Sequence, residues 1–273
     1  MSDETFAHDE ASACAANTCA LEARELRFGW DGAHPVLGTE ECGISLNIGA
    51  GSCLAILGPN GVGKTTLLSI LAGRLRAQSG EVRLSGRLLG EFSPRERAMR
   101  IALLPQIEKL AFNYRVLDFV LMGRTPHMEI FSLPGAEDEK AARDALATVG
   151  LTSLAERNIG ALSGGEFQLV RIARCLAQGA PMLILDEPAS MLDPAHSRQI
   201  ADVLAALQRA GKTIVYTTHD LGLAMFLGGR AVLLGRGRIL WEGSADGLQD
   251  AAILERCFGL PFANRTIPSA LFH

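Results

Sequence analysis

Several features are scarce in this 273-residue chain, and each scarcity excludes a class of protein. Aromatic residues make up only 5% of the chain, which argues against a surface that stacks nucleic-acid bases. Positive charge is not in excess, because 26 Lys and Arg residues face 30 Asp and Glu residues, for a net charge of −4. Without a basic stripe, we expect no nucleic-acid partner.

Long apolar runs and export features are also lacking. The best apolar candidate, residues 221–235, is interrupted by Gly228, Gly229 and Arg230, and it falls short of the about 18 apolar residues that a membrane-spanning helix needs. The first residues are polar and acidic, unlike the basic start and apolar core of a signal peptide. We therefore expect a chain that does not cross a membrane and whose six cysteines, none in a Cys-x-x-Cys pair, are reduced thiols.

Short apolar runs recur along the chain and alternate with helical stretches. Residues 53–57, 182–185, 213–218 and 231–234 are each short and apolar, which is typical of strands buried on both faces. Helical patterns stand between the later runs. This alternation predicts an α/β fold with a mostly parallel sheet and crossover helices.

The rest of the chain divides into three further segments. Residues 1–20 are expected to form a disordered acidic tail. Residues 91–160 have a helical pattern and are interpreted as a helical insertion, in which residues 137–149 form a helix with an acidic first turn. Residues 244–273 are expected to form a C-terminal helical extension, with Ser244 as the cap of its last helix.

The strongest motif is a glycine-rich loop that ends in a lysine and two threonines, Gly58-Pro59-Asn60-Gly61-Val62-Gly63-Lys64-Thr65-Thr66. It matches the pattern Gly-x-x-x-x-Gly-Lys-Ser/Thr and stands between a predicted buried strand and a helix. Glycines let successive backbone N–H groups turn towards a phosphate chain, and the positive end of the helix points to the same place. Lys64 would contact the β- and γ-phosphates, and the Thr65 hydroxyl would bind Mg²⁺. The position between strand and helix favours phosphate binding over a plain glycine-rich turn.

Two carboxylates, Asp186 and Glu187, directly follow the apolar run 182–185. Ligands bind at the carboxyl ends of strands in open α/β sheets, so this pair is well placed for chemistry. Asp186 can hold Mg²⁺, and Glu187 can polarise an attacking water. Alone, such a pair could be a solvated strand end; the upstream phosphate loop favours catalysis.

A third motif is Leu162-Ser163-Gly164-Gly165-Glu166. Ser163 can cap a helix, and the two glycines leave backbone N–H groups bare, which makes a second anion-binding helix start. Taken alone, the motif could be simply a capped helix.

Together and in this order, the three motifs resemble the ATP-binding subunit of ABC transporters. The resemblance implies a RecA-like P-loop NTPase over residues 21–243, with a mostly parallel sheet, an antiparallel β subdomain and a helical insertion. It also implies that the chain binds ATP with Mg²⁺ and hydrolyses ATP. Gln106 then resembles the glutamine that binds Mg²⁺ and senses the γ-phosphate, His219 the switch histidine at the γ-phosphate, and Asp193 the aspartate of the D-loop.

The same resemblance supplies the remaining nucleotide contacts. Trp30, rather than Phe28, would stack on adenine, unless its ring only packs against the protein. Ser163, Gly164 and Gly165 of one copy would close over the ATP of a second copy, which implies a head-to-tail homodimer. The chain departs from the family pattern at Leu169, where arginine is usual.

A more specific resemblance is carried by the segment 123–127, Gly-Arg-Thr-Pro-His, followed by Glu137-Asp138-Glu139. These residues are similar to those of ABC importers for iron–siderophore, haem and cobalamin complexes. The alternative is that Arg124 and His127 merely end a helix.

The importer resemblance implies partners and a location. Separate polytopic permease subunits would dock on the helical insertion, a solute-binding protein would act indirectly, and the chain would lie peripherally on the cytoplasmic face of the plasma (inner) membrane. An exporter ATPase and a soluble ABC ATPase of the iron–sulfur assembly type remain alternatives. A GTPase is disfavoured because the chain has no Asn-Lys-x-Asp motif.

Overall fold

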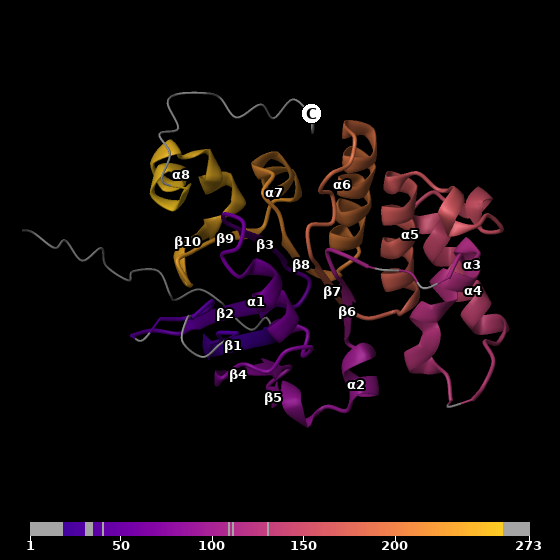
Figure 1. Ribbon diagram of the computed structural model, residues 1–273, viewed down its shortest axis with the longest axis horizontal. Coiled ribbons are helices and arrows are strands. Elements are labelled where there is room, and N and C mark those ends of the chain that lie inside the picture. The colour runs from indigo at the N-terminus through magenta and orange to yellow at the C-terminus, as the bar shows by residue number, and fades with distance from the viewer. Residues whose placement is uncertain are drawn as a thin grey trace, which may run out of the picture.

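The apolar runs of the sequence form the central strands of a six-stranded sheet (Figure 1). The computed structural model describes residues 19–30, 35–39, 41–108, 110, 112–129 and 131–258. Five strands of the sheet are parallel, and β10 at one edge is antiparallel to β9. In spatial order the strands are β10 (Arg238–Ser244), β9 (Arg230–Gly235), β3 (Cys53–Leu57), β8 (Thr213–Thr217), β7 (Met182–Leu185) and β6 (Ile101–Leu104).

A second sheet is antiparallel and covers one side of the first. Its strands alternate buried and exposed side chains; on β2, for example, Ile44, Leu46 and Ile48 are buried and the residues between them are exposed. In spatial order its strands are β2 (Ile44–Gly49), β1 (Cys19–Arg27), β4 (Ser79–Leu84) and β5 (Arg87–Leu88). Because β1 begins at Cys19, it includes the last two residues of the expected tail, and residues 1–18 lie outside the described residues.

Helices pack against the main sheet, and α3, α4 and α5 gather at one end of the molecule (Figure 1). The α-helices are α1 (Lys64–Leu71), α2 (Pro94–Ala98), α3 (Val116–Leu121), α4 (Ala136–Thr148), α5 (Gly164–Ala177), α6 (Pro194–Arg209), α7 (Leu221–Leu227) and α8 (Ala251–Phe258). The 3₁₀ helices are η1 (Leu89–Glu91), η2 (Met122–His127), η3 (Thr152–Leu154), η4 (Ile159–Ala161) and η5 (Ala245–Gln249). In the part of the chain with described coordinates, none of these helices has the length and apolar character to cross a bilayer.

Two expectations about local structure differ from the structure. The stretch 91–160 is not helical throughout, because it contains β6, which pairs in parallel with β7 at the edge of the main sheet. Ser244 caps η5 rather than the last α-helix, since its hydroxyl accepts a hydrogen bond from the Asp246 N–H at 3.4 Å. In the first case the pattern was insufficient, because periodicity alone does not distinguish a short apolar strand from a buried helical segment.

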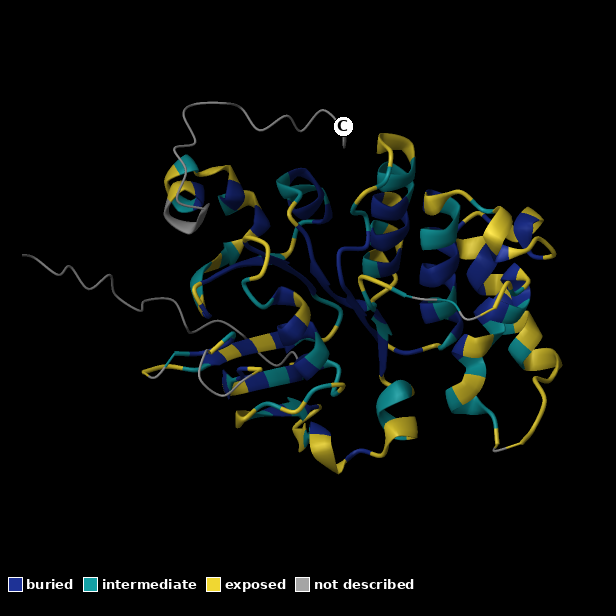
Figure 2. Ribbon diagram, viewed as in Figure 1, coloured by how far each residue is buried: buried dark blue, intermediate teal, exposed yellow. Residues whose placement is uncertain are grey.

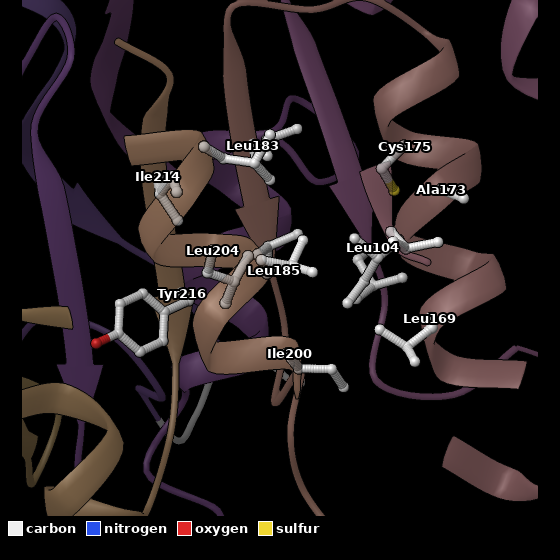
Figure 3. Close-up of a cluster of buried hydrophobic side chains, with 14 of the residues drawn as sticks. Leu104, Leu169, Ala173, Cys175, Leu183, Leu185, Ile200, Leu204, Ile214 and Tyr216 are labelled. Atoms are coloured by element: carbon white, nitrogen blue, oxygen red, sulfur yellow. The ribbon is translucent and has the colours of Figure 1, made fainter. Parts of the chain in front are cut away.

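The main sheet separates two hydrophobic cores. On β3, Cys53, Ala55 and Leu57 face one core and Leu54 and Ile56 face the other. The first core lies between the sheet and helices α3 to α7, where side chains of β7 and β8 meet those of α5 and α6 (Figure 3). The central strands are therefore buried on both faces, as Figure 2 shows, and this burial explains their unbroken apolar sequences.

Candidate active site

The glycine-rich loop joins β3 to α1 and is shaped by positive φ angles. Gly58 has φ 150°, and a Cβ there would lie 2.2 Å from the Leu234 carbonyl oxygen, so no other residue fits. Gly61 has φ 77°, and a Cβ there would meet nothing within 4 Å. The loop thus presses against the end of β9 on one side and opens at Gly61 on the other. A backbone of this shape can surround a phosphate group.

Lys64 folds back into this loop. Its Nζ donates hydrogen bonds to the carbonyls of Gly58 at 2.8 Å and Pro59 at 3.0 Å, and the residue is 7% exposed. Burial lowers the pKa of the ammonium, and the negative charges of Glu187 and Asp186 oppose that shift. The ammonium therefore stands close to both the loop and the carboxylate pair, where a phosphate chain would complete its hydrogen bonds.

The two carboxylates lie at the carboxyl end of β7 and are held from β8. The Thr217 hydroxyl donates to Asp186 Oδ1 at 2.6 Å and accepts from the Glu187 backbone N–H at 2.9 Å. Asp186 and Glu187 are 2% and 8% exposed. Thr217 was not among the predicted site residues. The sequence feature that could have identified it is its place at the end of the neighbouring apolar strand.

Glu187 and His219 are brought together, although they are 32 residues apart in the chain. Glu187 has φ 52°, a conformation that non-glycine residues rarely adopt and that is concentrated at functional sites. The pair lines a cavity of about 210 Å³ together with Ser190, Met191 and Asp220, among others. The arrangement can hold a water molecule against a carboxylate beside an imidazole.

Gln106 follows β6, which is the neighbour of β7. The Asp186 backbone N–H donates to the Leu104 carbonyl at 2.9 Å, so the two segments leave the sheet side by side. Gln106 is exposed at this point. Gln106, Asp186 and Thr65 offer only oxygen ligands from amide, carboxylate and hydroxyl groups, and this donor set suits Mg²⁺.

Trp30 lies in a turn after β1 and is 68% exposed. The rings of Trp30 and Phe28 form a T-shaped pair, with centroids 5.0 Å apart and planes at 88°. The Gln78 side chain fixes the turn, because it accepts from the Gly29 N–H and donates to the Gly29 carbonyl, both at 2.9 Å. Phe28 is 9% exposed, so Trp30 is the ring that can reach a ligand.

The third motif forms the start of α5 with a complete capping box. The Ser163 hydroxyl accepts from the Glu166 N–H at 3.2 Å, and the Glu166 carboxylate accepts from the Ser163 N–H at 2.7 Å. The Ser163 donors lower the pKa of the Glu166 carboxyl. Gly164 is exposed, whereas Gly165 is buried under the ring of His196.

The structure keeps this motif away from the glycine-rich loop. Helix α5 lies at one end of the molecule with α3 and α4, while α1, which carries Lys64, lies on the other side of the main sheet (Figure 1). Asp193, also predicted to approach a nucleotide, caps α6 by accepting from the N–H groups of Ala195 at 3.0 Å and His196 at 3.1 Å. Because of the position of α5, a single copy does not bring Ser163 to its own phosphate loop.

The segment 123–127 ties three elements together and does more than end a helix. The Arg124 guanidinium donates to Asp138 Oδ1 at 3.0 Å and to the Ala177 carbonyl at 2.9 Å. The His127 Nε2 lies 2.8 Å from the Gln178 carbonyl oxygen. The two side chains thus meet the carbonyl end of α5, where the positive charge of Arg124 is favourable.

Comparison with known proteins gives consistent results. The sequence model of the family described as ABC transporter matches residues 42–190. A protein named "Hemin import ATP-binding protein HmuV" from Myxococcus xanthus is 38% identical over 248 residues, which cover 88% of this chain and 90% of the relative. A protein of the same name from Gloeobacter violaceus is 42% identical over 224 residues, covering 80% and 81%.

Solved structures agree with the sequence matches. A metal-chelate type ABC transporter in an inward-facing conformation aligns with a TM-score of 0.77 and 31% identity, covering 89% of this chain and 90% of that chain. A dimeric bacterial ABC transporter cassette aligns with a TM-score of 0.72 and 27% identity, covering 82% and 98%.

Proposed function

The chain belongs to the ABC transporter family, and on this premise we propose that it is the ATP-hydrolysing subunit of an importer for haem or a related metal chelate. Lys64, Glu187 and His219 converge at the carboxyl ends of the parallel strands of the main sheet. This convergence is the observation that supports ATP hydrolysis. Two proteins similar to it in sequence are named for hemin import, which supports the choice of a metal chelate over the cargo of an exporter.

In the proposed mechanism, each residue has a defined task. The loop 58–66 and Lys64 bind the phosphate chain of ATP, and Trp30 stacks on the adenine. Glu187 accepts a hydrogen bond from the attacking water, and His219 orients both Glu187 and the γ-phosphate. Mg²⁺, held by Thr65, Gln106 and Asp186, would neutralise part of the charge on the phosphates.

We infer that the catalytic unit is a head-to-tail homodimer. The capped start of α5 exposes Ser163 and Gly164 at the surface, yet it lies away from the phosphate loop of its own chain. A second copy would bring its own Ser163–Gly165 and Asp193 to the first copy's ATP.

Separate permease subunits would dock beside the edge strand β6. A groove of about 530 Å³ opens there, lined by residues of α1's end, α2, β6 and α5, among them Arg97, Ile101, Ile107, Glu108 and Arg174. Ile107 is 75% exposed at this groove, as an apolar contact for a partner would be. Through the permease, the chain would be held peripherally at the cytoplasmic face of the plasma (inner) membrane, and a solute-binding protein would deliver the cargo without touching this chain.

Co-purification followed by transport tests this proposal. A tagged Glu187→Gln chain is incubated with ATP and detergent-solubilised membranes from its own cell, and the captured permease is reconstituted in vesicles with the wild-type chain. We expect ATP to drive haem across the membrane, from the side of the solute-binding protein to the side of this chain. Movement in the reverse direction would indicate an exporter, and capture of soluble proteins alone would indicate a non-transport ABC ATPase.

A further inference from the structure

Helix α5 carries a stripe of polar side chains that runs from the candidate nucleotide contact to the permease groove. Gln168, Arg171, Arg174 and Gln178 follow the start of the helix at spacings of three or four residues and therefore share one face. Arg174 and Gln178 line the groove, whereas Gln168 reaches the segment that follows the catalytic carboxylate.

Arg171 is the centre of this stripe. Its side chain is 5% exposed, and its guanidinium donates to Glu108 Oε2 at 3.1 Å and to Gln168 Oε1 at 2.6 Å. The same guanidinium donates to the carbonyl of Pro105, directly before Gln106. Arg174 binds Glu108 as well, at 2.5 and 2.9 Å. Residues 105–108 are thus anchored on α5 on both sides of Gln106.

Gln168 extends the contact to the catalytic carboxylate. Its Nε2 donates to the Pro188 carbonyl at 2.8 Å, while its Oε1 accepts from Arg171. This orientation of the amide is the one that satisfies both partners, because a guanidinium only donates and a carbonyl only accepts. The neighbouring backbone groups are also held, since the Glu187 N–H binds Thr217 and the Glu187 carbonyl accepts from Ser190.

We propose that Arg171 and Gln168, here called the α5 relay, are positioning residues that fix Glu187 and Gln106 relative to each other for ATP hydrolysis. The Arg171–Pro105 contact spans 66 residues and the Gln168–Pro188 contact spans 20, so the relay adds side-chain contacts between segments that leave the paired strands β6 and β7 side by side. The strained φ of 52° at Glu187 requires support from its surroundings, and the hydrogen bond to Pro188 supplies part of it. This proposal rests on the proposed ATPase function.

The first test replaces the side-chain amide nitrogen of Gln168 by an oxygen. In the full-length chain, Gln168→Glu keeps an acceptor for Arg171 but loses the donor for Pro188. The control is Gln199→Glu, which loses a similar amide donor to the Val149 carbonyl, 3.1 Å away and outside the site. We expect Gln168→Glu to lower kcat by about tenfold or more, with KM for ATP, affinity for a fluorescent ATP analogue and Tm equal to those of the control. Equal kcat in both variants would overturn the proposal.

The same substitution in a Glu187→Gln chain tests whether Gln168 affects the hydrolysis rate by positioning Glu187. In a Glu187→Gln chain, adding Gln168→Glu should not lower the residual single-turnover rate further; a decrease by the same factor in both backgrounds would show a general structural effect instead. Arg171→Met should lower kcat as Gln168→Glu does, and the double variant should be no slower than Arg171→Met alone. Arg143→Met, which removes exposed ion pairs to Glu139 and Glu156, is a surface control for the loss of an arginine.

A failure of the α5 relay proposal can be distinguished from a failure of the proposed ATPase function. Wild-type hydrolysis that Glu187→Gln abolishes supports the ATPase assignment whatever the relay variants do. Absence of hydrolysis in the wild-type chain and its permease complex would contradict both proposals, whereas unchanged relay variants with an active wild type would contradict the relay alone.

Discussion

His219 and Glu187 are joined by a hydrogen bond of 2.9 Å between the imidazole Nδ1 and the carboxylate Oε2. The carboxylate side chain is 8% exposed and the imidazole 63%, so the pair leads from the interior of the protein to its surface. The carboxylate is thereby held in place while the imidazole remains accessible to a substrate. This geometry motivates the first prediction.

Glu187→Gln should abolish hydrolysis and leave ATP binding intact. The amide keeps the size of the side chain but cannot accept a proton from water, so we expect the rate of phosphate release to fall by about 10²- to 10⁴-fold. The ATP-bound dimer should then accumulate and be visible by size-exclusion chromatography with light scattering. Glu156→Gln, at an exposed carboxylate, should retain the wild-type rate. Wild-type hydrolysis in Glu187→Gln would refute the assignment of the base.

Lys64→Met should weaken ATP binding by roughly 10- to 100-fold, because it removes a charged hydrogen bond to the phosphates. Titration with a fluorescent ATP analogue measures the dissociation constant. Lys212→Met is a matched control, since the Lys212 ammonium also donates to a backbone carbonyl, that of Ala180 at 2.7 Å, but lies outside the site. Equal dissociation constants for the two variants would be inconsistent with a phosphate contact at Lys64.

Gly165→Ala should destabilise the chain through His196. A Cβ at position 165 would lie 2.2 Å from the His196 Cγ, so the ring must move away from its contact with Asp193. We expect a loss of about 1–3 kcal/mol in the free energy of unfolding, measured in urea. His196→Ala in the same chain should recover part of this loss, whereas Gly164→Ala, which meets nothing within 4 Å, should be tolerated. Equal stabilities of the two alanine variants would contradict this prediction.

Asp138→Asn should reduce the acid sensitivity of the fold. The Gly135 N–H and the Arg124 guanidinium lower the pKa of the Asp138 carboxyl below its ordinary value of 3.8. Between the two pKa values the unfolded chain binds more protons than the folded chain, so this contribution to stability is present above about pH 4–5 and is lost as the pH falls through the folded pKa. Urea unfolding between pH 3 and 7 measures the slope. Asp144→Asn, on the same helix, serves as the control, and an equal slope in both variants would contradict the assignment.

Much of the fold could be predicted because its signals are local. The central strands are continuous apolar runs, since each is buried on both faces, and their expected bounds agree with β3 and β7. β6, Ile101–Leu104, was missed because periodicity alone does not distinguish a short apolar strand from a buried helical segment, and this run follows the helical residues of α2. Its pairing with β7 decided its structure.

The sequence by itself determined the chemistry of the separate segments: the glycine-rich loop before a helix, the carboxylates at the end of a strand, and the capped start of α5. Such features depend on residues that are neighbours in the chain, so their spacing and order predict them. Only the tertiary structure decided which of them meet. Thr217 holds Asp186 from 31 residues away, and Arg171 reaches Pro105 across 66, because parallel strand pairing and helix packing, rather than sequence proximity, bring these groups within hydrogen-bonding distance.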